Sequence, residues 1–158
     1  MSIYNRILFE SDSSDPQKQK IGPSGLSLFG PTIPVEIAIP DELARYYSAQ
    51  NTPIPPPVTG DALIDTGASI TAVDLTVLQQ LGIQPVGTAN VYTPQGSDVQ
   101  ELFPVRLMLS GTAIVMRLKA VLGSQLRNQN IVALIGRNVL SSCILVYNGP
   151  FGNFSLSI

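Results

Sequence analysis

The feature that most constrains this chain is an apolar run that ends in a turn carrying one carboxylate. Residues 62–64 are Ala-Leu-Ile, and the turn Asp65-Thr66-Gly67-Ala68 follows them directly. Glycine lets a backbone bend sharply and approach a second group closely. Apolar neighbours favour the protonated form of a carboxyl group held among them. The stretch therefore predicts a strand that delivers an acid into a turn, where its protonation can be adjusted.

The surroundings of the turn make it more specific than the tripeptide alone. Asp-Thr-Gly consists of common turn residues and arises by chance in roughly a few per cent of chains of this length. Here β-prone runs lie on both sides, since Ile-Thr-Ala-Val occupies 70–73. A second apolar run, 131–135, is also closed by a glycine. Its continuous apolar character predicts a strand that is buried on both faces.

Together, the two stretches resemble the aspartic proteases, and more closely the retroviral, or retropepsin-like, type. In that type, one Asp-Thr-Gly-Ala per chain is paired with a later apolar-apolar-Gly-Arg-Asn. Leu134-Ile135-Gly136-Arg137-Asn138 matches this second signature along its whole length. The resemblance implies a mostly β, closed barrel-like acid protease fold with one or two short helices.

The resemblance also implies roles for the residues of the turn. Asp65 is the expected catalytic acid, and Thr66 is expected to hold the turns of two subunits together. Gly67 is expected to let the substrate backbone pass close by. Ala68 stands where pepsin-like enzymes usually carry a hydroxyl group that stabilises the ionised acid. Without that donor, we expect activity at mildly acidic to near-neutral pH.

The number of such turns decides how a site can be assembled. Hydrolysis of this type uses two acids that share one proton, one to activate water and one to protonate the carbonyl oxygen. The chain has one Asp-Thr-Gly, and Asp61, Asp74 and Asp98 lack its flanking pattern. We therefore expect a homodimer in which Asp65 of two chains forms the dyad across a two-fold axis. The expected activity is that of an aspartic endopeptidase acting on peptides or unfolded protein.

Two features depart from the family pattern. Many retroviral enzymes carry an Asp after Asp-Thr-Gly-Ala that pairs with the Arg of the second signature, whereas Ser69 leaves Arg137 without that partner. An insertion also occupies 40–59, where viral enzymes use a short turn. Its first part, 41–47, predicts one or two helical turns, because a proline and two acids stand at its start. Its second part, 52–57, is Pro-rich and is expected to be an extended, stiff connector, with docking to another domain as the alternative.

The resemblance divides the chain into an N-terminal arm, 1–28, and a protease domain, 29–158. The arm either packs on the domain, which we favour, or is a pro-segment trimmed by the protease. Its polar part, 10–25, is expected to be a loop. At the other end, 143–158 predicts a hairpin around Asn-Gly-Pro. This hairpin is similar to the retroviral-protease-like domain of the DNA-damage-inducible shuttle proteins, in which hairpins form the interface.

Between these ends, the pattern predicts a strand over 26–39, a helix over 74–81, two strands at 103–109 and 113–122, and a short helix at 137–142. Residues 91–102 predict a hairpin. At this place the resembling enzymes carry the flap, which folds over the substrate and excludes water. The expected flap tip comprises Pro94, Gln95, Gly96 and Ser97.

Composition excludes several other chemistries. The chain has no histidine and one cysteine, so neither a Ser-His-Asp nor a Cys-His nucleophile system can form. A zinc site would need carboxylates almost alone, and we expect neither a metal nor a cofactor. Cys143 lies in an apolar stretch and is expected to be a small core residue.

Charge and hydropathy limit the kinds of partner that we expect for this chain. The net charge is −2, with scattered basic residues, so nucleic acid is not an expected partner. Residues 1–10 lack the features of a signal peptide, and no stretch is long enough to span a bilayer. We therefore expect a cytoplasmic protein with no membrane partner. The alternative function is a non-catalytic dimeric module of the same fold that binds peptides or regulates another protein.

Overall fold

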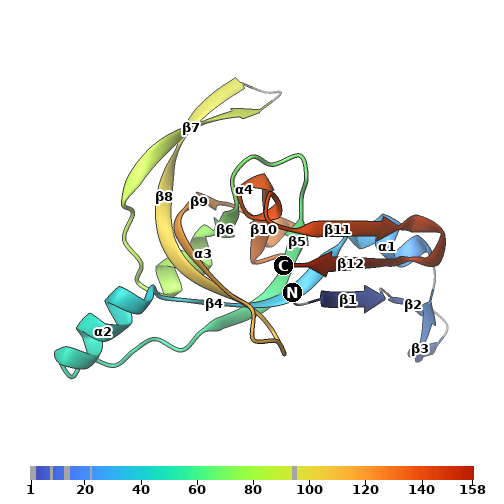
Figure 1. Ribbon diagram of the computed structural model, residues 1–158, viewed down its shortest axis with the longest axis horizontal. Coiled ribbons are helices and arrows are strands. Elements are labelled where there is room, and N and C mark those ends of the chain that lie inside the picture. The colour runs from blue at the N-terminus through green and yellow to red at the C-terminus, as the bar shows by residue number, and fades with distance from the viewer. Residues whose placement is uncertain (1–2, 8, 13–14, 22, 94–95) are drawn as a thin grey trace.

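The computed structural model of this chain describes residues 3–7, 9–12, 15–21, 23–93 and 96–158. Most elements among these residues are strands, which confirms the predicted mostly β class (Figure 1). Seven strands form the main sheet in the order β4-β5-β10-β6-β9-β8-β7. They are β4 (Thr32–Ala38), β5 (Val58–Ile64), β6 (Ala72–Asp74), β7 (Gly87–Thr93), β8 (Gly96–Leu109), β9 (Val115–Ser124) and β10 (Ala133–Ile135).

The main sheet closes on itself. Strand β4 pairs with β5 along one edge and with β8 along the other, so the pairings β4-β5-β10-β6-β9-β8 form a ring. Strand β7 pairs with β8 outside this ring. Val35, Val73, Leu107 and Ala133 come from four different strands of the ring and are fully buried. The main core therefore includes inward-facing side chains of the ring, as expected for a closed sheet.

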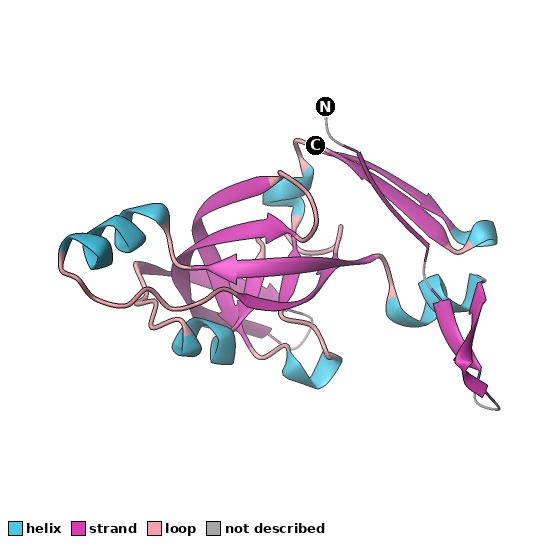
Figure 2. Cartoon of the chain, turned by 90° about the horizontal axis from the view of Figure 1, so that it is seen from below, coloured by secondary structure: helices cyan, strands magenta, loops and turns pink. Residues whose placement is uncertain are grey.

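A second sheet is formed by the two ends of the described chain. Strand β12 (Asn153–Ser157) lies between β1 (Ile3–Ile7) and β11 (Ile144–Asn148), and both pairings are antiparallel. The short 3-10 helix η2 (Gly149–Phe151) connects β11 to β12 and completes the predicted C-terminal hairpin. Figures 1 and 2 both show this sheet set to one side of the ring.

The N-terminal segment differs from the prediction. In place of a loop over 10–25, the chain forms a hairpin of β2 (Phe9–Asp12) and β3 (Asp15–Ile21), followed by helix α1 (Pro23–Phe29). The polar hairpin offers no apolar alternation to detect. Helix α1 begins at a proline, which suits the first helical position, and ends before Gly30, at φ +69°. The predicted strand over 26–39 is therefore wrong in its first part.

Three further helices lie along the chain: α2 (Asp41–Ala49), α3 (Leu75–Gln80) and α4 (Arg137–Leu140). With α1, the described residues contain four α-helices, more than the one or two predicted, besides the 3-10 helices η1 (Arg127–Gln129) and η2. The helical turns expected at 41–47 and 74–81 are confirmed. None of the helices in the described part of the chain has the length and apolar character needed to cross a membrane.

Strand β8 is longer than predicted. It runs continuously through the second arm of the hairpin predicted at 91–102 and through the segment 103–109, which was predicted as a separate strand. Pro104 lies in its middle, and the register with β9 shifts between Phe103 and Val105. Proline has no N–H for the ladder, so an irregularity at this point lets the strand continue past it.

Candidate active site

Asp65 lies where two inner strands end side by side. Strands β5 and β10 are parallel, and Ile64 is the register partner of Ile135. The backbone N–H of Asp65 continues this pairing by donating to the carbonyl oxygen of Ile135 at 3.0 Å. The Asp65 side chain is half-buried, and its Oδ1 accepts a hydrogen bond from the Gly67 N–H at 2.7 Å. The turn therefore orients the carboxylate locally and leaves it reachable from solvent.

The turn passes over the end of β10. Strand β10 lies between β5 and β6, so the chain must cross that end to go from one to the other. Two backbone groups of the second signature bind the turn as it crosses. The Arg137 N–H donates to the Ala68 carbonyl at 2.9 Å, and the Asn138 N–H donates to the Ser69 carbonyl at 3.1 Å. The two motifs recognised in the sequence are therefore in direct contact.

A buried threonine links the second signature to β6. The side-chain oxygen of Asn138 accepts hydrogen bonds from both the N–H and the hydroxyl of Thr71, each at 2.8 Å. The Thr71 hydroxyl also accepts a hydrogen bond from the Gly136 N–H at 3.1 Å. Thr71 is fully buried, and sequence reasoning missed it as a site residue. A hydroxyl within an apolar run was the available signal, because buried polar groups need partners.

Gly136 is required by a close approach of two backbones. A Cβ atom at this position would lie 2.7 Å from the carbonyl carbon of Ile70 and 2.9 Å from the nitrogen of Thr71. Both atoms belong to the main chain, which cannot move aside as a flexible side chain would. The glycine of the second signature therefore lets the turn segment pack directly against the end of β10.

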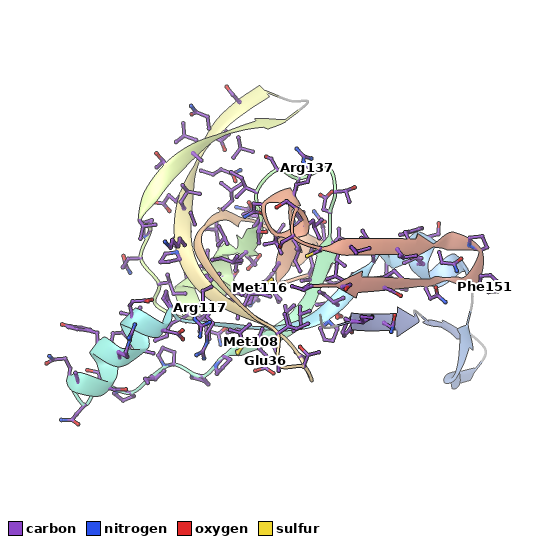
Figure 3. The ribbon with its side chains drawn as sticks, in the orientation of Figure 1. Glu36, Met108, Met116, Arg117, Arg137 and Phe151 are labelled. Atoms are coloured by element: carbon purple, nitrogen blue, oxygen red, sulfur yellow. The ribbon has the colours of Figure 1, made fainter. Side chains whose placement is uncertain are left out.

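The side chain of Arg137 has partners that the sequence did not reveal. Its Nη1 donates to the carbonyl oxygens of Thr66 and Gly67, both at 2.8 Å. Figure 3 shows Arg137 at the top of the ring, beside this turn. With Ser69 in place of an acid, the guanidinium group binds backbone oxygens of the turn. Arg137 therefore braces the two residues that follow Asp65.

Comparison with known proteins agrees with this arrangement. The family model described as "Aspartyl protease" matches residues 57–139, which is more than half of the chain. The chain belongs to the aspartyl protease family. The matched segment of the protease runs from just before β5 into α4, so it contains Asp65 and the whole second signature. The prediction of an aspartic protease is thereby confirmed at the level of the family.

Three solved structures are similar to the protease. The protease of simian foamy virus is 19% identical, with a match over 70% of this chain and 91% of that chain and a TM-score of 0.41. The EIAV protease is also 19% identical, over 70% and 85% of the two chains, with a TM-score of 0.44. A retropepsin-like aspartic protease from Rickettsia conorii is 10% identical, over 99% and 95%, with a TM-score of 0.46. No curated protein sequence matches.

The predicted flap of the protease corresponds to the end of the β7–β8 hairpin. Thr93 pairs with Gly96, whose φ of +137° favours glycine. Ser97 is exposed, whereas Pro94 and Gln95 lie outside the described residues. In Figure 1, the hairpin rises on the same side of the ring as the turn between β5 and β6. The flap remains a prediction, with this common placement in its favour.

A second carboxylate of the protease, Asp74, has a structural place. It is buried and accepts hydrogen bonds from the N–H groups of Thr76 at 2.9 Å, Leu126 at 2.8 Å and Arg127 at 3.0 Å. Desolvation acts to raise the pKa of Asp74. The hydrogen bonds from Leu126, Thr76 and Arg127 outweigh it and hold the pKa below the ordinary 3.8. Asp74 therefore caps α3 and fastens the 125–129 loop to it.

The described part of the protease offers few other groups for metal binding or nucleophilic chemistry. Within that part, no group of three or more His, Cys, Asp or Glu residues is placed to hold a metal ion. Cys143 is half-buried, and its Sγ lies 3.4 Å from the carbonyl oxygen of Val139. Burial raises the pKa of the Cys143 thiol above its ordinary value. A thiol held in its protonated form is a weak nucleophile, which fits the predicted packing role.

Proposed function

We propose that this chain is an aspartic endopeptidase that acts as a homodimer, with Asp65 of two copies forming the catalytic dyad. The observation that carries the proposal is the turn at Asp65. It presents one carboxylate, stands at the end of two inner strands, and is braced by the second signature through Arg137 and Asn138. Such bracing is what a catalytic group needs, because small displacements of a reacting group cost large factors in rate.

The proposed reaction follows from placing two such turns face to face. Carboxylates about 3 Å apart cannot both ionise, so the pair holds one proton. The ionised Asp65 removes a proton from a water molecule, whose oxygen bonds to the peptide carbonyl carbon. The protonated Asp65 of the other copy gives its proton to the carbonyl oxygen. Transfer of a proton to the peptide nitrogen then lets the carbon–nitrogen bond break.

The terminal sheet supports the dimeric form. Strand β11 lies at the edge of this sheet, so one side of its backbone has no strand partner among the described residues. Ile144, Val146, Tyr147 and Phe151 lie along β11 and η2, and all are at least half exposed. Figure 3 shows Phe151 at the far end of the sheet, away from the ring. Apolar side chains gathered on an edge strand are typical of a surface that pairs with another chain.

Substrate contacts follow from the same arrangement. Thr66 and Gly67 are exposed beside Asp65, where an extended peptide could bind to the backbone of the turn. Closure of the β7–β8 hairpin over the peptide would exclude water from the dyad. The proposed substrates are therefore extended peptides or unfolded protein chains.

Turnover of a fluorescently labelled unfolded protein tests this function. The wild-type protein should cleave it, Asp65→Asn should not, and Glu36→Gln should cleave it normally. Glu36 makes a suitable control because Figure 3 places it on the side of the ring opposite Arg137. Adding excess Asp65→Asn protein to wild type should reduce activity, since mixed dimers contain one acid. Equal cleavage by the Asp65→Asn protein would refute the proposal, and absence of cleavage by the wild-type protein would favour a non-catalytic binding module.

A further inference from the structure

A cavity separate from the catalytic turn lies between the start of α2 and strands β8 and β9. Its volume is about 230 Å³, and its apolar wall is formed by Pro40, Pro104, Val105 and Leu118. In Figure 3, Arg117, which also lines it, lies beside α2, away from Arg137 at the top of the ring. Pockets for small-molecule ligands typically enclose about 300–1,000 Å³. This cavity therefore suits one or two side chains better than a whole cofactor.

The charged lining of the cavity has an excess of cations. Three cations, Arg106, Arg117 and Lys119, line it together with two acids, Asp41 and Glu42, and Glu42 is paired at 3.3 Å with Arg45, which lies outside the lining. Asp41 is held between the two arginines, with Oδ1 2.9 Å from Arg106 Nη1 and Oδ2 2.6 Å from Arg117 Nε. Positive charge therefore remains in the lining after Asp41 and Glu42 are paired, which favours a negatively charged ligand.

One donor in the cavity lining has no partner. The Nε of Arg106 is buried and makes no hydrogen bond within the described structure, although its Nη1 binds Asp41. Buried N–H groups are nearly always paired, because an unpaired donor costs free energy. Lys119 is exposed and has no ion pair among the described residues. Lys119 therefore has donors to spare for an incoming carboxylate, and the Arg106 Nε gains a partner only if its side chain turns toward the ligand.

We propose that this cavity binds an acidic peptide, with one side-chain carboxylate on Arg106 and Lys119 and an adjacent apolar side chain against Pro40 and Pro104. The apolar wall requires that the acid have an apolar neighbour. The site lies outside the catalytic turn and does not depend on Asp65 being active.

The ¹⁵N–¹H resonance of the Arg106 Nε–H reports binding directly. Asp65→Asn protein is used so that no peptide is cleaved, and the resonance is assigned by its loss in Arg106→Lys. We expect N-acetyl-Leu-Glu-amide to shift this resonance in a saturable manner, while N-acetyl-Leu-Gln-amide and inorganic phosphate do not. Removing one charged partner in Lys119→Gln should weaken the binding about tenfold. Arg127→Gln removes another exposed cation, which lies outside the cavity, and should leave the affinity unchanged.

Each alternative outcome is distinct. Equal shifts with the glutamate and glutamine peptides would overturn the proposal, as would stronger binding of phosphate than of the glutamate peptide. Equal loss of affinity in Lys119→Gln and Arg127→Gln would show only general attraction to a positive surface. Absence of cleavage by the wild-type protein has no bearing on these titrations, so the two proposals stand or fall separately.

Discussion

At the scale of single residues, the contacts around the turn explain why the second signature contains glycine. The Gly136 position has no space for a Cβ, since the backbone of Ile70 and Thr71 occupies it. The Thr71 hydroxyl and the Asn138 side chain then complete the contact with hydrogen bonds that only a correctly packed backbone allows. The signature is therefore a packing requirement as well as a mark of the family.

The first prediction concerns this packing. Gly136→Ala should destabilise the fold by about 1–3 kcal/mol, the usual effect of forcing a methyl group into a filled site. Urea unfolding followed by circular dichroism measures the loss. Gly87→Ala is the matched control, because a Cβ there would meet no atom within 4 Å. We expect the control to change stability by less than about 0.5 kcal/mol. Equal effects of the two substitutions would contradict the packing argument.

The second prediction concerns pH. Because the pKa of Asp74 is lower in the folded state than its ordinary 3.8, its contribution to stability is complete above that value. The contribution is lost as pH falls below 3.8 through the folded-state pKa. Asp74→Asn should cost about 1–3 kcal/mol at neutral pH, because a buried acceptor of three hydrogen bonds is altered. The difference between the variant and wild type should shrink in acid.

Urea unfolding at several pH values, from pH 7 down to values below 3.8, measures how the stability depends on pH. Arg127→Gln serves as its control, since the Arg127 Nε lies 3.8 Å from Asp74 and is mostly exposed. We expect that variant to keep most of the stability, because the three backbone donors remain. A difference between Asp74→Asn and wild type that stays constant into acid would rule out the assigned role.

At the scale of elements, the predictable parts of the fold are those whose own sequence carries a signal. Helix α3 has both ends marked, with Asp74 accepting from the Thr76 N–H and Gly82 at φ +66° beyond its last turn. The hairpin of β2 and β3 has a polar sequence without apolar alternation. Its pairing therefore leaves no signal in the sequence. The continuation of β8 past Pro104 depends on β9, which accommodates the register shift.

The candidate site likewise contains residues that could be predicted from the sequence and residues that could not. Asp65 and the second signature are recognisable as motifs, whereas Thr71 and the partners of Arg137 depend on the meeting of segments far apart in the chain. In the resembling enzymes an acid pairs with this arginine, and here Ser69 stands in the place of that acid. The backbone oxygens that replace it have no sequence signal, because every residue carries a carbonyl group.

The third prediction tests how α4 supports the turn. Arg137→Lys keeps the charge but loses the planar guanidinium group that reaches both Thr66 and Gly67. If the braced turn positions Asp65, kcat should fall about tenfold or more, as expected for losing a hydrogen bond from a charged group. The melting temperature should change little, because the side chain is exposed. Steady-state kinetics with the unfolded-protein substrate measures the effect, and an unchanged kcat would contradict it.

At the scale of the whole molecule, the N-terminal strand joins the C-terminal hairpin. Strand β1 pairs along its full length with β12, from Ile3 opposite Ser157 to Ile7 opposite Asn153. For residues 3–7 this pairing agrees with an arm that packs on the domain, whereas the division at residue 28 and trimming by the protease remain predictions. Removal of β1 would turn β12 into an edge strand of the same sheet, so any trimming would change the sheet proposed to join two copies.

The last prediction tests that surface. Val146 is 55% exposed on the edge strand β11, so Val146→Glu should leave the single chain folded. In a dimer that buries this strand, the new carboxylate would lose its water without gaining a partner, which opposes association. Sedimentation velocity should therefore show a shift from dimer to monomer, and cleavage should disappear together with the dimer, because one Asp65 cannot form a dyad.

Val86→Glu adds the same charge at a site that is 62% exposed outside the terminal sheet, and it should change neither the oligomeric state nor the cleavage activity. An active, dimeric Val146→Glu protein would place the interface elsewhere, and an active monomer would refute the shared dyad.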